Sequence, residues 1–100
     1  MLHTVNKSPF EKNSLDTCLR LAKPGSAILL IEDGVYAAMR GSQAQEKIND
    51  AMNQHKLYAL GLDLKSRGLD NGKILEGIEI VDYDGFVRLA AENDSVQSWL

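Results

Sequence analysis

The chain has 100 residues, of which 44% are hydrophobic and 25% charged, and its formal net charge is −3. This composition predicts one soluble globular domain over residues 1–100, because a chain of this length buries about two-thirds of its unfolded surface around a single core. Its basic residues are dispersed, which argues against direct nucleic-acid binding. The longest apolar run, 27–31, is too short to span a membrane, and the first residues lack a signal-peptide pattern, so we expect a cytoplasmic protein.

Strand and helix patterns alternate along the chain without a linker, an internal repeat or a low-complexity segment. The apolar run 27–31 is typical of a strand covered on both faces of a parallel sheet. In chain order we expect a strand at 2–5, a helix at 14–22, a strand at 27–31, helices at 35–39 and 43–54, a strand at 56–60, a helical turn at 62–67, a loop at 69–77, a strand at 78–81, a helix at 83–92 and a strand at 95–100.

This alternation predicts the α/β class: a single three-layer domain with a mainly parallel sheet of four to five strands and helices on both faces. Asn13 or Ser14 is expected to cap the first helix, and Asp82 the last. The predicted inner face of that last helix consists of Tyr83, Phe86, Val87 and Ala90.

In such a sheet, sites form at the carboxyl ends of the strands. The loop after the first strand contains Pro9 and no glycine, which excludes a flavin phosphate loop. Acids are not clustered there as in a receiver domain, and no Walker or dinucleotide motif occurs. We therefore expect no cofactor and no metal ion.

A polar turn follows the second predicted strand at Glu32, Asp33 and Gly34. These residues fit either a polar site at the sheet edge, with Glu32 as its mobile member, or an ordinary helix start. In the second interpretation, which we favour, Asp33 caps the next helix and Gly34 supplies an unusual backbone angle.

Three further side chains have both a structural and a functional interpretation. His3 lies in a strand predicted to be central, where a hydrogen-bonded structural histidine is expected. His55 precedes the third strand and is expected to be solvated. Trp99 fits a partner anchor and a filler between helix and sheet equally well.

Cys18 is the only cysteine, so an internal disulfide or a cysteine-rich metal site is excluded. It lies at one edge of the apolar stripe of the first helix, where its sulfur faces either the core or a partner. No nearby group lowers its pKa from about 8.5, and residue chemistry alone favours a packed, inert thiol.

Five segments together resemble the DsrH/TusB family over the whole length of the chain. They are the opening 1–11, the turn and helix 32–38, the strand 57–60 with Asp63 and Leu64, the segment 81–87 and the ending 96–100. Five colinear matches are more specific than any single motif.

The resemblance implies a small subunit of a DsrEFH-type heterohexameric sulfurtransferase complex in cytoplasmic sulfur oxidation, which relays persulfide sulfur toward a DsrC-like carrier. Its partners would be DsrE/TusD-like and DsrF/TusC-like subunits, with the main sulfur-accepting cysteine on the DsrE/TusD type. DsrH-type members carry a cysteine on the first helix, as Cys18 does here, so Cys18 is the candidate sulfur acceptor. The alternative is a TusB-type, non-catalytic scaffold in the complex for tRNA 2-thiouridine synthesis. In either case the chain is not expected to be catalytic alone.

Overall fold

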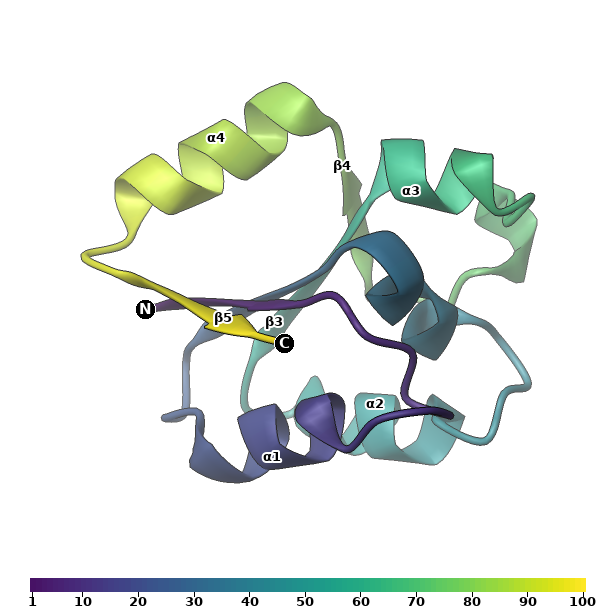
Figure 1. Ribbon diagram of the computed structural model, residues 1–100, viewed down its shortest axis with the longest axis horizontal. Helices are drawn as coiled ribbons and strands as arrows, with labels where there is room; N and C mark the ends of the chain where they lie inside the picture. The colour runs from purple at the N-terminus through teal and green to yellow at the C-terminus, as the bar shows by residue number, and fades with distance from the viewer.

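The computed structural model describes residues 1–100 as a three-layer α/β domain. Five strands form one sheet in the order β4-β3-β2-β1-β5, and every neighbouring pair is parallel. Helices α1 and α2 lie on one side of this sheet and α4 on the other (Figure 1). The predicted fold class is therefore confirmed, with all five expected strands present.

The observed elements follow the predicted order closely. In chain order they are β1 (Leu2–Val5), α1 (Ser14–Leu21), β2 (Ala27–Leu30), the 3₁₀ helix η1 (Glu32–Ala38), α2 (Gln45–Ala51), β3 (Lys56–Leu60), α3 (Gly61–Ser66), the 3₁₀ turn η2 (Asn71–Lys73), β4 (Glu79–Val81), α4 (Tyr83–Glu92) and β5 (Val96–Trp99). No helix is long and apolar enough to cross a bilayer.

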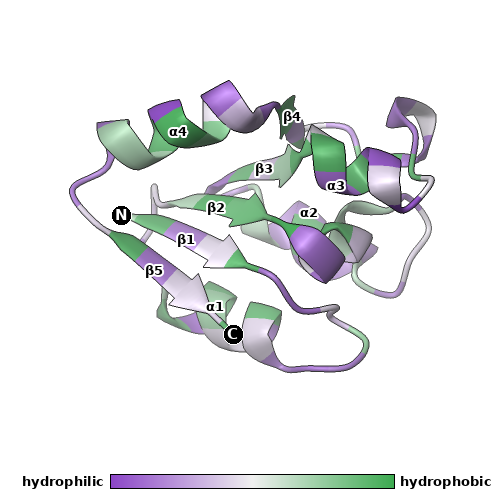
Figure 2. Ribbon diagram, turned by 45° about the horizontal axis from the view of Figure 1, so that its top comes forward, coloured by the Kyte–Doolittle hydropathy of each residue, from purple (hydrophilic) through white to green (hydrophobic).

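The central strand β2 is buried on both faces of the sheet. Strand β2 is buried at all four positions and is hydrophobic along its length in Figure 2. It pairs with β1 from Leu2↔Ala27 to Val5↔Leu30. A strand with no polar face must be covered on both sides, and the crossover helices between parallel strands provide that cover.

The two faces of the sheet are covered unequally. The face under α1 and α2 holds a core of 18 buried residues, whereas the face under α4 holds a cluster of only five. On that second face the helix contributes Phe86, Leu89 and Ala90, each only partly buried. Most of the apolar burial that stabilises the fold thus lies on the α1/α2 side.

The predicted inner face of the last helix is half wrong. Phe86 and Ala90 face the sheet, but Tyr83 is 67% and Val87 51% exposed, and Leu89 takes the inner position. The apolar arc of α4 is wider than the narrow strip of sheet beneath it, so one flank of that arc faces solvent.

The helix caps and the second predicted helix also differ in part from the sequence-based predictions. Asp82 caps α4 as predicted, accepting a hydrogen bond from the Gly85 N–H at 2.7 Å. Asn13 is the N-cap residue of α1, but its side chain makes no capping hydrogen bond. The expected helix at 35–39 is instead a 3₁₀ helix that starts at Glu32, because the chain turns directly out of β2 with an i to i+3 bond from the Gly34 N–H to the Ile31 carbonyl.

Candidate functional site

Cys18 lies on the inner face of α1, and its exposed fraction is 0%. It belongs to the large core on the α1/α2 side, in the same cluster as Leu15 and Ile28. Burial raises the pKa of the thiol to about 12. The fraction of thiolate at neutral pH is then on the order of one in 10⁵, so the sulfur faces the core and is not a ready nucleophile in this conformation.

His3 is a buried structural histidine, as predicted, and its partner is Trp99. The indole Nε1–H of Trp99 donates a hydrogen bond of 3.0 Å to His3 Nδ1, and the two rings stack with their centroids 6.1 Å apart. Trp99 therefore packs between α1 and the sheet and fastens β5 to β1. Burial, with smaller contributions from the N-terminal charge and His55, lowers the pKa of His3.

The lowered pKa of His3 predicts a loss of stability in mild acid. The unfolded chain takes up a proton near the ordinary value of about 6.5, but the folded chain resists it until lower pH. Stability should be greatest above about pH 6.5 and fall as the pH drops through the window below it. Chemical denaturation of wild type and His3→Gln between pH 5 and 8 measures this: the variant, which cannot titrate there, should show the shallower slope. Parallel slopes would contradict the assignment.

His55 departs from the prediction. His55 is buried rather than solvated. Its backbone N–H donates to the Ala51 carbonyl at 2.9 Å, and Nδ1 of its ring has no hydrogen-bond partner. His55 lies in the short turn between α2 and β3, and a residue count from the strand does not reveal its burial there.

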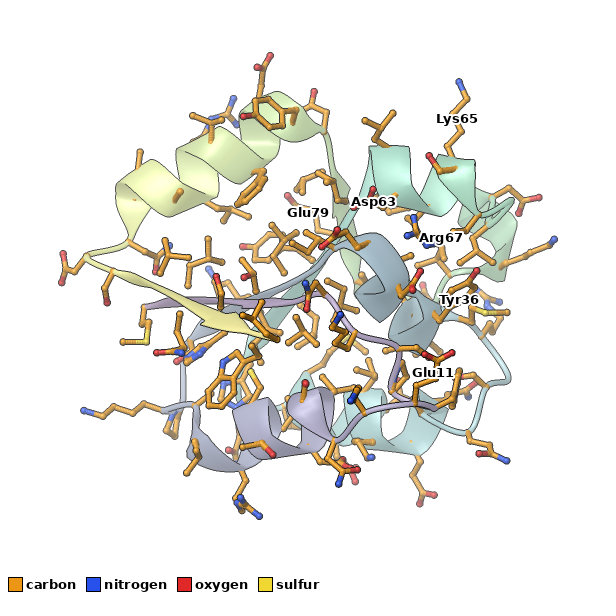
Figure 3. The ribbon with its side chains drawn as sticks, viewed as in Figure 1. Glu11, Tyr36, Asp63, Lys65, Arg67 and Glu79 are labelled. Atoms are coloured by element: carbon orange, nitrogen blue, oxygen red, sulfur yellow. The ribbon has the colours of Figure 1, made fainter.

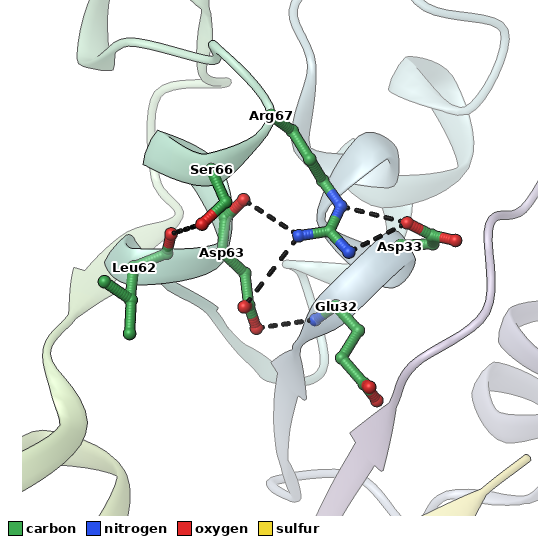
Figure 4. Close-up of polar contacts among 6 residues, drawn as sticks. All are labelled: Glu32, Asp33, Leu62, Asp63, Ser66 and Arg67. Atoms are coloured by element: carbon green, nitrogen blue, oxygen red, sulfur yellow. Dashed lines mark hydrogen bonds and ion pairs between the residues drawn. The ribbon is translucent and has the colours of Figure 1, made fainter.

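A polar cluster joins the carboxyl ends of β2 and β3 (Figure 4). The guanidinium of Arg67 contacts Asp33 Oδ1 through both Nε and Nη2 at 2.9 Å, and its Nη1 donates to the Asp63 carbonyl at 3.2 Å. Asp63 Oδ2 accepts the backbone N–H of Glu32 at 2.6 Å. These contacts tie α3 to η1 across 34 residues of chain.

Asp33 and Gly34 do not have the roles predicted for them. The N-cap position of η1 is Ile31, no side chain caps the helix, and Asp33 pairs with Arg67 instead. The left-handed backbone angle occurs at Glu32, with φ +49°, and not at Gly34. Gly34 is needed for a different reason: a Cβ there would lie 2.1 Å from the Val5 carbonyl oxygen. Glu32 remains exposed, with its carboxylate outside the cluster's contacts.

Arg67 was missed by the sequence reasoning. The one available signal was its i, i+4 spacing from Asp63 on a short helix, which predicts a local ion pair but not the contact with Asp33. In Figure 3, Arg67 and Asp63 turn toward η1, whereas Lys65 of the same helix points away from the body of the domain.

Replacing the Arg67 guanidinium with a neutral side chain should destabilise the polar cluster without unfolding the domain. Arg67→Gln leaves two carboxylates near each other. Because the Asp33 side chain is 55% exposed, solvent screens the pair, and we expect a loss of about 1 kcal/mol, or roughly 4–8 °C in Tm. Lys65→Gln is the matched control and should stay within about 0.5 kcal/mol of wild type. Equal shifts for both variants in thermal unfolding would show that the cluster contributes nothing specific.

An open groove of about 690 Å³ lies between α3 and α4 beside β4. Its walls include Leu62, Ile80 and Tyr83, with Lys65 and Arg88 at the rim. No thiol or imidazole lines it, and nowhere in the structure do three His, Cys, Asp or Glu side chains gather as metal ligands would. The groove therefore offers no sulfur nucleophile for a relay.

Comparison with known proteins adds the family. The model of the family described as DsrH like protein matches residues 7–96. Protein TusB of Shigella flexneri is 41% identical over 99 residues, covering 99% of this chain and 100% of that one, and Protein TusB of Escherichia coli is 40% identical over the same lengths. The chain belongs to the DsrH/TusB family.

Solved structures agree with the fold of this DsrH/TusB chain. The ychN protein of Escherichia coli superposes with a TM-score of 0.80 at 18% identity, covering 97% of each chain. A protein of unknown function from Methanobacterium thermoautotrophicum gives a TM-score of 0.71 at 17% identity, with 97% of this chain and 95% of that one covered. At these identities the likeness concerns the architecture alone.

Proposed function

We propose that this DsrH/TusB chain is a structural subunit of a sulfur-relay complex, one that completes the assembly without carrying sulfur itself. Family membership supports the relay, and the observation that carries the structural role is the complete burial of Cys18. A sulfur acceptor must reach both donor and carrier, and a thiol sealed in the core reaches neither. The groove and the polar cluster supply no other nucleophilic sulfur.

Within the family we favour the branch that serves tRNA 2-thiouridine synthesis. Relatives named TusB at 40% and 41% identity over nearly the whole chain support it. Cys18 on the first helix supports instead the DsrH branch, linked to sulfur oxidation, with Cys18 as sulfur acceptor. Burial weakens that support, because a packed cysteine on α1 serves the core whether or not sulfur chemistry follows.

The partners are those of the family: TusD-like and TusC-like subunits that form a dimer of heterotrimers with this chain, and a TusE-like carrier that takes sulfur from the complex. Several large apolar side chains on the surface suit a subunit of an assembly. They include Phe10, Leu21, Leu62, Tyr83, Val87 and Val96.

Co-expression tests the proposal. With TusC-like and TusD-like proteins from the same source, the chain should purify as one heterohexamer, seen by native mass spectrometry. The same gene should restore tRNA 2-thiouridine in a bacterial strain that lacks its own TusB. Free monomer in every mixture would refute the complex, and a normal complex that fails to restore thiolation would shift the assignment to the sulfur-oxidation branch.

A further inference from the structure

Strand β5 forms an open edge of the sheet. It pairs only with β1, and the Leu2 N–H donates to the Ser95 carbonyl at 3.0 Å. In a parallel ladder alternate residues turn their N–H and C=O groups to the same side, so those of Val96 and Ser98 point away from β1. The Ser98 carbonyl accepts an exposed hydrogen bond of 3.3 Å from the Gln97 side chain, which a docking strand would replace. We call this row the β5 edge; no further strand follows it in the sheet, and Figure 2 shows β5 as the last strand, with α1 beneath it.

The β5 edge is held in an extended form before any partner arrives. Trp99 donates to His3, and Thr4 Oγ1 lies 3.3 Å from Ser98 Oγ in a hydrogen bond across the two strands. Ser14 Oγ of α1 donates to the Leu100 carbonyl at 3.1 Å. A segment that docks here therefore meets a formed template, which lowers the entropic cost of binding.

The β5 edge lacks charge and proline, two of the features that keep exposed edges from pairing. Its four residues include no charge and no proline, and Val96 is 48% exposed beside it. The opposite edge is different: β4 carries Glu79, and Lys65 and Arg88 lie in the groove alongside. Because charge on an edge strand discourages strand addition, the uncharged β5 edge is the one suited to accept a strand.

The charges around the β5 edge indicate what covers it. Asp94 and Glu92 lead into β5 and have no ion-pair partner. A second copy of this chain would present its own segment 94–100, which contains no Lys or Arg to answer them. An extended segment of a different chain, with an apolar residue against Val96 and a Lys or Arg near Asp94, satisfies both the backbone groups and the acids.

We propose that the β5 edge accepts an extended segment of another subunit by strand addition, so that the sheet continues into the partner. This rests on the proposed function, which supplies the TusC-like and TusD-like subunits as candidates. The direct test is hydrogen exchange of the purified complex. The amides of Val96 and Ser98 should exchange rapidly in the free chain and at least tenfold more slowly in the complex.

Variants then test the edge and its charge separately. In co-expression with both subunits, Val96→Glu should reduce the recovered partner at least tenfold, and Asp94→Lys, an exposed loop change that leaves the core intact, about threefold. Glu79→Lys on the β4 edge is the matched control and should recover wild-type amounts. Circular dichroism should show the free variants folded.

The possible results distinguish the strand addition at the β5 edge from the proposed function. A wild-type complex whose Val96 and Ser98 amides remain fast, or whose yield is unchanged in Val96→Glu, overturns the strand addition and leaves the proposed function standing. A homodimer of the chain alone that is lost in Val96→Glu overturns the charge argument in favour of a second copy. Absence of any wild-type complex overturns the proposed function and this inference together.

Discussion

Gly34→Ala is expected to lower the free energy of unfolding more than the same substitution at any other glycine of the chain. The added Cβ would lie 2.1 Å from the Val5 carbonyl oxygen and 2.9 Å from its carbonyl carbon. Both are backbone atoms of the interior strand β1, which is hydrogen-bonded on both sides and cannot move without disturbing β2 and β5. We expect a loss of about 3 kcal/mol or more, a large part of the stability of a domain this small.

Denaturant titration measures the loss, and Gly72→Ala is the matched control. Gly72 lies in an exposed turn, its φ is not positive, and the nearest atom to a Cβ there is Asp70 Oδ1 at 3.4 Å, an ordinary contact. The control should stay within about 0.5 kcal/mol of wild type. Comparable midpoints for the two variants would mean that η1 can lift away from β1 at little cost.

The second large effect is protection of Cys18 from alkylation. With its pKa raised to about 12, the folded thiol at pH 8 is ionised about 10³-fold less than an unfolded thiol of pKa about 8.5, and the core also excludes the reagent. Labelling by iodoacetamide should therefore be at least about 10³-fold slower in buffer than in denaturant. Because the pKa is raised on folding, protonation of the thiol favours the folded state below about pH 8.5, and this contribution is lost as the pH rises further.

Mass spectrometry follows the reaction through a single adduct, since the chain has one cysteine. Cys18→Ala should take up no label under either condition and serves as the blank. A native rate within tenfold of the unfolded rate would show that α1 opens readily, and it would revive the sulfur-accepting role of Cys18, which stays a prediction.

The sequence predicted the sheet well because its signals were local. The run 27–31 has no polar position, so it had to be a strand covered on both faces, and the Asp82 cap follows from a single oxygen three residues before Gly85. The inner face of α4 was harder. Its apolar arc includes more residues than the sheet beneath it can cover, and no pattern within the helix says which flank stays in solvent.

The candidate site was less accessible to sequence reasoning because its contacts join distant segments. Asp33 and Arg67 are 34 positions apart, and nothing at either position indicates the other. The left-handed angle at Glu32 also depends on distant contacts: Asp63 accepts the Glu32 N–H, and Gly34 lies against β1, so the left-handed residue stands two positions before the glycine. Cys18 lay at the edge of its apolar stripe, and only the packing of α1 decided that the thiol faces inward.

On the proposed function, this subunit supports sulfur relay without handling sulfur. The most direct measurement is the rate of sulfur transfer from a persulfide donor to the TusE-like carrier by the reconstituted complex. Three preparations are compared: wild type, Cys18→Ala, and the partners without this chain. We predict that Cys18→Ala stays within about twofold of wild type, while omission of the chain reduces the rate at least tenfold. A Cys18→Ala complex that assembles normally yet transfers sulfur as slowly as the incomplete one would contradict the account.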